Sequence, residues 1–284
     1  MLGNWIGGHD TPIWLEPSGW RAAGAHAAFS FRLGGVSQGP FASLNAGGHV
    51  GDDASAVTAN RAKIAAHLSV PVHDIAMAEQ VHGSRVALVG EDWLELAPQQ
   101  RVPFAATDAL VTHVRGIALG ILTADCVPVL FFDPVQRVVA AAHSGWRGTV
   151  EGISSRVVKT MVEVYGCRAQ NVRAVLGPAI RRCCYEVDES VAGAFIDRFG
   201  RAHATIRPGR PGKFLLDLPS CIRKDLLEAG VSPHHLQDTG VCTACRNDVL
   251  FSYRADGGRT GRQLAVVGLR AKRRGGDLSC DQFA

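Results

Sequence analysis

A cysteine and a histidine stand at the ends of two neighbouring apolar runs and could do chemistry together. Cys126 follows the polar residues 123–125 and precedes the run VPVLFFD, and His143 ends the run RVVAAAH just before a serine and a glycine. Such a pair has three interpretations: neighbours in the core, a nucleophilic dyad whose imidazole stabilises the thiolate, or two ligands of a metal such as zinc. The polar and small residues around the pair favour a functional role, because functional groups are commonly displayed at the ends of elements.

A hairpin between the two runs would bring this pair together. The connection Asp-Pro-Val-Gln, residues 133–136, contains an Asp-Pro turn signal. Pairing that is symmetric about the 134–135 bond places Cys126 directly opposite His143, with their Cβ atoms about 4.5–5.5 Å apart. We therefore expect the two side chains to face each other across this hairpin.

The rest of the chain alternates between strand-like and helix-like patterns. Besides the hairpin arms at 127–133 and 137–143, strand-like runs cover 117–123, 172–177 and 263–269, and helical spacing covers 54–68, 149–165, 188–199 and 217–229. A glycine- and proline-rich stretch at 207–212 is predicted to be a surface loop. Strands outnumber helices and short turns join several of them, which predicts an α+β (mixed α/β) fold: a single domain of mixed, largely antiparallel sheets with flanking helices.

The bulk composition excludes several classes of protein. Of the 284 residues, 46% are hydrophobic and 20% are charged, which is typical of a compact enzyme-like domain rather than a disordered chain. A formal net charge of +4 is too small to indicate nucleic-acid binding, although it suits a small anionic substrate. No apolar run approaches the roughly 18 residues of a membrane span, and the N-terminus lacks the pattern of a secretory signal. We therefore expect a cytoplasmic protein with free thiols.

Seven sequence blocks occur in an order that resembles a known family. They are FSFRLGGVSQGPFASLNAGGHVGDD (29–53), EQVHG (79–83), TDALVT (107–112), TADCVPVLFFD (123–133), AAHSGWRGT (141–149), LGPAIRRCCYEV (176–187) and FSYRADGGRTGRQLAVVGL (251–269). Together they resemble the polyphenol oxidase (laccase)-like proteins, a family also described as purine nucleoside phosphorylases with adenosine deaminase activity and as peptidoglycan editing factors. The resemblance implies a single catalytic domain over 26–270, similar in fold to cysteine-dependent deamidating toxins, with an N-terminal extension (1–25) and a C-terminal tail (271–284).

The same resemblance implies a zinc site formed by His82, Cys126 and His143, which are also the implied catalytic residues. Of the three, only His82 depends on the resemblance alone, since the hairpin already pairs the other two. Three protein ligands leave a fourth position open, as in catalytic zinc sites, where the metal acidifies water and polarises a substrate oxygen. Copper is not expected, because a multicopper cluster needs several His-x-His pairs and no two of the eleven histidines are separated by a single residue.

Four arginines and one asparagine are the candidate binding residues for an anionic substrate. Arg147 lies in the turn before the helical pattern at 149–165, and a helix N-terminus would also favour phosphate. Arg254 and Arg262 belong to the glycine-rich block 251–269, and Arg61 and Asn45 are weaker candidates. Each arginine alone could instead form a structural salt bridge, but we expect at least one to reach the site.

The remaining clustered cysteines are expected to be structural or incidental. CTAC, Cys242–Cys245, is a CxxC without a second CxxC after it, and no proline precedes it as in the zinc nucleobase deaminases. Cys183 and Cys184 are adjacent in RCCYE and are predicted to pack near a loop. The basic run at 270–276 is predicted to be a solvated tail.

The family resemblance, together with the complete set of His82, Cys126 and His143, implies a zinc-dependent purine nucleoside phosphorylase, in which phosphate attacks the anomeric carbon of adenosine, inosine or guanosine and releases the base and ribose 1-phosphate. The resemblance also implies adenosine deaminase activity, and methylthioadenosine is a further substrate to consider. The expected partners are a purine nucleoside and phosphate, with no nucleic acid and no membrane; the oligomeric state stays open. One alternative is a thiol hydrolase with Cys126 as nucleophile and His143 as base, cleaving an amide of a peptidoglycan precursor. Another is a partner-binding protein with a vestigial site.

Overall fold

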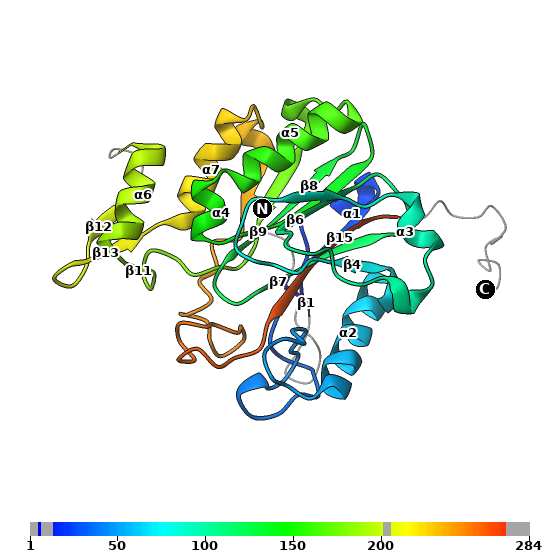
Figure 1. Ribbon diagram of the computed structural model, residues 1–284, viewed down its shortest axis with the longest axis horizontal. Coiled ribbons are helices and arrows are strands. Elements are labelled where there is room, and N and C mark those ends of the chain that lie inside the picture. The colour runs from blue at the N-terminus through cyan, green and yellow to red at the C-terminus, as the bar shows by residue number, and fades with distance from the viewer. Residues whose placement is uncertain (1–4, 7–13, 201–205, 271–284) are drawn as a thin grey trace, which may run out of the picture.

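Two six-stranded sheets form the centre of the molecule (Figure 1). The computed structural model describes residues 5–6, 14–200 and 206–270. In order across the first sheet, the strands are β1 (Trp5–Ile6), β2 (Trp14–Leu15), β3 (Ala25–Ser30), β15 (Gln263–Leu269), β7 (Ala118–Thr123) and β4 (Ile75–Met77). The second sheet runs β14 (Leu236–Asp238), β10 (Arg173–Leu176), β8 (Val127–Asp133), β9 (Val138–Ser144), β6 (Ala109–Thr112) and β5 (Val86–Leu88).

A third, three-stranded sheet and seven α-helices complete the described part of the fold. The small sheet runs β11 (Glu186–Asp188), β13 (Lys213–Leu216) and β12 (Ile206–Pro208). The helices are α1 (Trp20–Ala23), α2 (Ala54–Leu68), α3 (Glu91–Glu95), α4 (Trp146–Val150), α5 (Ile153–Tyr165), α6 (Glu189–Phe199) and α7 (Leu218–Glu228). This arrangement confirms the predicted mixed α/β single domain with largely antiparallel pairing.

The two large sheets pack face to face, and helices cover their outer faces. Strand β8 explains why: Phe131 belongs to the core cluster shared with Val157 of α5, whereas Phe132 belongs to the cluster shared with Leu119 of the first sheet. A strand buried on both faces reads as a continuous apolar run, which is how VPVLFFD appears in the sequence. In Figure 1, α5 and α7 lie on one side of the sheets and α2 lies on the opposite side, where its Ile64 packs beneath the first sheet.

The hairpin formed by β8 and β9 exists, but its predicted register was wrong. Pro128, not Cys126, lies opposite His143, and Asp133 pairs with Val138. The turn holds four residues because the Asp133 carboxylate accepts the backbone N–H groups of residues 135 and 136, and Arg137 adopts a left-handed φ of 57°. The pairing shifts by two residues, so Cys126 comes just before the paired strand and reaches His143 diagonally.

Two further predicted segments differ from the structure. The helix expected over 149–165 is divided into α4 and α5, because Gly152 adopts a φ of 77° that L-residues rarely adopt. Within the stretch predicted to be a surface loop, residues 209–212 form the exposed turn between β12 and β13, whereas residues 207–208 belong to β12. The predicted tail at 271–284, including the basic run from residue 271 onwards, and residues 1–4 and 7–13 of the predicted extension lie outside the described residues.

No helix in the described ranges has the length and apolar character needed to cross a membrane.

Candidate active site

The structure brings His82, Cys126 and His143 together at the edge of the two large sheets. His82 lies in the loop between β4 and β5, Cys126 directly precedes β8, and His143 lies within β9. Their potential ligand atoms all lie within 4.8 Å of one another, and the two imidazole rings meet edge to face with centroids 4.7 Å apart. Two nitrogens and one sulfur at this spacing form a donor set that could hold a metal ion.

A fully buried carboxylate, Asp108, orients both histidines. Its Oδ1 lies 2.8 Å from His143 Nδ1 and accepts the His82 backbone N–H at 3.0 Å, while its Oδ2 accepts the Gly83 N–H at 2.8 Å. With Nδ1 engaged by the carboxylate, His143 presents Nε2 to the cluster, which is the arrangement that fixes a ligating imidazole in metal sites. The sequence analysis assigned no role to Asp108, which lies 35 residues before His143 and is brought to it by the β6–β9 pairing.

A second buried carboxylate positions the cysteine. Asp125 adopts a φ of 98°, far outside the usual range for a residue with a side chain. Its Oδ1 accepts the hydroxyls of Thr243 and Ser252, and its Oδ2 accepts the Arg254 backbone N–H at 2.7 Å. These hydrogen bonds hold a strained backbone in place, and that backbone directs the next residue, Cys126, into the cluster.

The cysteine and the histidines change each other's protonation. Burial opposes the thiolate, but the charge and hydrogen bond of His143, together with His82, lower the pKa of Cys126 to about 6. Burial likewise opposes an imidazolium, but the Cys126 thiolate and Asp108 raise the pKa of His143 to about 9. Without a metal, the cluster therefore favours a thiolate beside an imidazolium near neutral pH.

Gly145 leaves room for this cluster. A Cβ atom placed on Gly145 would lie 3.1 Å from both Cys126 Sγ and His82 Cδ2. The glycine after the histidine is therefore required by close approach, as the small residues in AAHSGW indicate.

The cluster opens into a cavity of about 820 Å³. This volume is within the usual range for small-molecule sites. The wall is partly apolar, with Met77, Leu122 and Pro103, and partly aromatic, with Tyr185 and Tyr253. A planar heterocycle with a polar sugar would match such a lining.

Three basic side chains lie together on the wall of the cavity. Arg61, Arg262 and His49 line it. Burial and then the two arginines lower the pKa of His49, and burial lowers the pKa of both arginines. Neither arginine forms an ion pair with a carboxylate within the described part of the chain, since Arg61 donates to the Ala46 carbonyl and Arg262 to backbone carbonyls of its own loop. This wall suits an anion. The sequence analysis did not single out His49, although it lies in the block 29–53.

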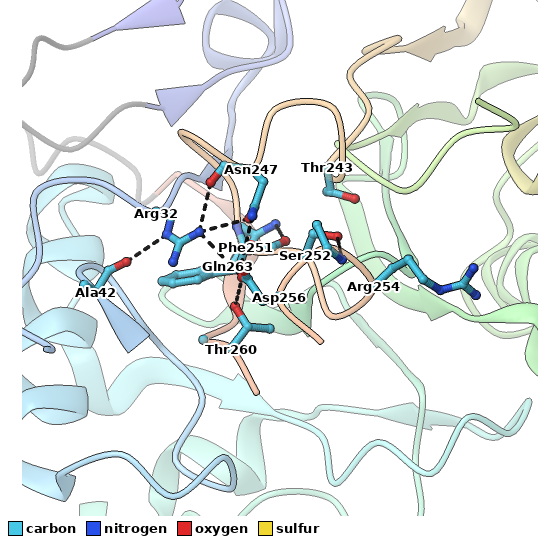
Figure 2. Close-up of polar contacts among 12 residues, drawn as sticks. Arg32, Ala42, Thr243, Asn247, Phe251, Ser252, Arg254, Asp256, Thr260 and Gln263 are labelled. Carbon is cyan, nitrogen blue, oxygen red and sulfur yellow. Dashed lines mark hydrogen bonds and ion pairs between the residues drawn. The ribbon is translucent and has the colours of Figure 1, made fainter. Parts of the chain in front are cut away.

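A hydrogen-bonded hub around Arg32 holds the loop that carries Arg262 (Figure 2). Arg32 Nε donates to the Ala42 carbonyl at 2.8 Å, and its Nη1 donates to Asn247. Asn247 and Thr260 in turn donate to the two carboxylate oxygens of Asp256. The block 251–269 is therefore tied to the loop at 32–43.

The other predicted binding residues have different surroundings. Arg254 lines the cavity, but its Nη1 donates to the Glu186 carbonyl, and its side chain extends away from the Arg32 hub (Figure 2). Arg147 is exposed, stacks over Trp146 and does not line the cavity. Asn45 is fully buried, and its Oδ1 accepts the backbone N–H groups of Gly47 and Arg262. Asn45 thus fixes the arginine's loop instead of facing the cavity.

A family model matches almost the whole described fold. The model for multi-copper polyphenol oxidoreductase laccase matches residues 26–270, which include the three cluster residues and the arginines of the cavity. The chain belongs to this family. Membership in the laccase-like family agrees with the resemblance that the seven sequence blocks indicate.

Relatives of the chain carry names of two nucleoside enzymes. Purine nucleoside phosphorylase YlmD of Geobacillus stearothermophilus is 38% identical over 90% of this chain and 94% of the relative. Purine nucleoside phosphorylase SCO2081 of Streptomyces coelicolor is 42% identical over 87% of this chain and 96% of the relative. A protein named adenosine deaminase RL5, from an unknown prokaryotic organism, is 35% identical over 83% of this chain and 88% of the relative.

Solved structures of laccase-like relatives share the fold. The crystal structure of YlmD from Geobacillus stearothermophilus superposes with a TM-score of 0.85 at 35% identity, over 94% of this chain and 99% of that one. The hypothetical protein YfiH of Bacillus licheniformis gives a TM-score of 0.84 at 33% identity, over 92% and 97%.

Proposed function

We propose that this laccase-like protein is a zinc-dependent purine nucleoside phosphorylase. The observation that carries the proposal is a cavity with two features: a cluster of two imidazoles and one thiol at His82, Cys126 and His143, and a basic wall at Arg61, Arg262 and His49. The names of the relatives supply the substrate class.

The donor set suits zinc better than copper. Imidazole nitrogen and thiolate sulfur are the ligands that zinc commonly takes, and three of them leave a position open for substrate. Among the described residues, this group contains only two histidines, too few imidazoles for a multinuclear copper cluster. When bound there, zinc would act as a Lewis acid that polarises a substrate oxygen or acidifies a water molecule.

The residues that line the cavity bind the two reactants, phosphate and the purine nucleoside. Arg61 and Arg262 bind phosphate and balance its negative charge beside the neutral imidazole of His49, while the apolar and aromatic wall receives the purine. A phosphate oxygen forms a bond to the anomeric carbon as the bond from that carbon to the purine nitrogen breaks. The base leaves with the electron pair and takes up a proton, which gives free base and ribose 1-phosphate. Orientation of two reactants in one cavity supplies much of the rate enhancement.

Adenosine deamination is a second proposed activity of the same cavity. The name of the relative RL5 supports it. In this reaction water replaces the exocyclic amine of adenine, and the products are inosine and ammonia. Methylthioadenosine belongs in the same substrate panel because it has the adenine, the glycosidic bond and the 2′- and 3′-hydroxyls of adenosine and differs only in carrying a methylthio group at the 5′ position.

The thiol hydrolase remains a second candidate function, favoured by one geometric observation. Cys126, His143 and Asp108 follow one another as nucleophile, base and orienting carboxylate, the order of a catalytic triad. Metal content separates the two candidates. Zinc-dependent activity that is abolished by chelation supports the phosphorylase, whereas metal-free amide cleavage that is blocked by alkylation of Cys126 supports the hydrolase.

The phosphorylase proposal is tested by release of hypoxanthine from inosine. We expect release only with phosphate present, and a loss of at least about 100-fold in His143→Ala, because a metal ligand is removed. Arg262→Gln should raise KM for phosphate far more than KM for inosine, since a group that binds only phosphate is lost. Full activity in His143→Ala would overturn the proposed site.

A further inference from the structure

Four cysteines from two distant loops meet outside the active site. Cys183 and Cys184 lie in the loop between β10 and β11, and Cys242 and Cys245 lie in the loop after β14. Their sulfur atoms all lie within 4.8 Å of one another. Cys184 Sγ is 3.4 Å and Cys183 Sγ is 3.5 Å from Cys245 Sγ. The vicinal pair takes the place of the second CxxC that the sequence lacks.

The spacing suits a single tetrahedral metal ion. Four sulfurs bound to one zinc at about 2.3 Å lie about 3.8 Å from each other. The separations of 3.4 and 3.5 Å are slightly shorter than this, and all four sulfurs lie within 4.8 Å of one another. An iron–sulfur cluster also takes four cysteines, but its several iron atoms hold the cysteine sulfurs farther apart. A disulfide would use two of the sulfurs at about 2.05 Å and leave the other two without a role.

Without a metal ion, the four thiols oppose one another's ionisation, and only Cys242 has a lowered pKa. Burial opposes ionisation of Cys242, but the backbone N–H groups of Cys245 and Arg181 point at its sulfur and lower its pKa. Burial and the neighbouring Cys245 thiol raise the pKa of Cys183 to about 11. Four thiols this close together cannot all ionise, because their negative charges repel one another. A metal ion bound among them would offset this repulsion and stabilise the thiolates.

The two loops are already paired at this point. Ala179 and Cys242 form an isolated parallel bridge, in which the Thr243 N–H donates to the Ala179 carbonyl at 3.1 Å. The same loops supply parts of the active site: Tyr185 follows Cys184 and lines the cavity, and the Thr243 hydroxyl donates to Asp125, which directs Cys126. A metal at the four cysteines would therefore fasten the loops that support the catalytic cluster.

We propose that Cys183, Cys184, Cys242 and Cys245 form a second, structural zinc site. All four coordination positions are taken by protein sulfur, so this ion does no chemistry on substrate. Its role is to join the loop after β10 to the loop after β14.

The test is the number of zinc ions bound per chain, measured by mass spectrometry on protein purified without chelator. Cys245→Ser should bind one zinc fewer than the wild type and unfold at a lower temperature. Cys167→Ala, which removes a buried cysteine outside both clusters, should keep the wild-type zinc content. The comparison holds whether or not the His82, Cys126 and His143 site is filled. Equal zinc in Cys245→Ser and the wild type would overturn the proposal, as would an intact mass lighter by the two hydrogens of a disulfide.

If Cys245→Ser does not fold, a second measurement tests whether the four cysteines bind zinc. In His143→Ala the active-site cluster has lost a ligand, so X-ray absorption at the zinc edge reports mainly on the four cysteines. We expect four sulfur neighbours at about 2.3 Å. Nitrogen or oxygen neighbours in that spectrum, or no bound zinc, would contradict the proposal.

Discussion

The two clusters of candidate metal ligands differ in what surrounds them. The cluster of His82, Cys126 and His143 opens into a cavity and rests on the buried carboxylate Asp108. The four-cysteine cluster lies between two loops, and all of its donors are sulfur. An open mixed set is typical of a catalytic metal, and a closed sulfur set is typical of a structural one.

The difference also lies in how each cluster controls the charge of its thiols. In the first, the thiolate is stabilised by the histidines beside it, which lower the pKa of Cys126 to about 6. In the second, neighbouring thiols and burial raise the pKa of Cys183 and Cys184, and no imidazole belongs to the group. The residues of the first cluster therefore stabilise a thiolate without a metal ion. In the second cluster, a bound cation would be needed to stabilise the thiolates.

Among changes outside the three cluster residues, removing the carboxylate that supports the first cluster should have the largest effect. Asp108→Asn replaces one acceptor oxygen by a donor in a buried network and leaves His143 less firmly oriented. We expect zinc affinity or activity to fall by roughly 10- to 100-fold, as for other groups that orient a metal ligand. Zinc titration and steady-state kinetics measure this. Asp133→Asn is the matched control, because Asp133 is equally buried but belongs to the hairpin turn; it should lower stability without changing zinc affinity.

The contrast in thiol ionisation can be measured in protein stripped of metal. Because the pKa of Cys126 is about 6, its alkylation rate should rise through pH 6 and then level off, whereas that of Cys183 should keep rising towards pH 11. At pH 7.5 we expect Cys126 to react roughly tenfold faster, once the lower nucleophilicity of the more acidic thiol is included. Peptide mapping after iodoacetamide treatment gives both rates. Equal pH midpoints would remove the distinction between the clusters.

The smallest effect should come from crowding the first cluster. Gly145→Ala places a methyl group 3.1 Å from Cys126 Sγ and His82 Cδ2, so one of them must move by a few tenths of an ångström. Since displaced catalytic groups lose rate, kcat/KM should fall a few-fold. Gly193→Ala, where a Cβ meets nothing within 4 Å in the middle of α6, should leave activity unchanged and raise stability slightly. An unaffected Gly145→Ala would show that the cluster tolerates displacement.

Much of the fold could be predicted because its central strands are buried on both faces. Runs such as 127–133 and 263–269 are continuously apolar, and the structure places strands there with the same bounds. The hairpin register could not be predicted, because it depends on the Asp133 carboxylate capping two amides and on the left-handed Arg137. Turn chemistry of this kind is set by side-chain hydrogen bonds that apolar periodicity does not report.

The sequence predicted that Cys126 and His143 lie together and, through the family resemblance, that His82 joins them, but it missed the two carboxylates that support this cluster. Cys126 and His143 stand out because polar residues interrupt apolar runs, whereas His82 needed the family resemblance. Asp108 is the second residue of the block TDALVT and directly precedes the buried strand β6, and a carboxylate at that position is a signal that could have been used. The four cysteines escaped because a vicinal pair and a CxxC are far apart in sequence and become one group only when β10 and β14 lie side by side.

The central claim is that the open cluster and its basic wall carry out phosphorolysis of a purine nucleoside. Phosphorus NMR of the zinc-loaded protein with inosine and phosphate tests it most directly. We predict that a ribose 1-phosphate signal grows in step with hypoxanthine and disappears in His143→Ala. Hypoxanthine without the sugar phosphate, or the sugar phosphate at the wild-type rate in His143→Ala, would contradict the account.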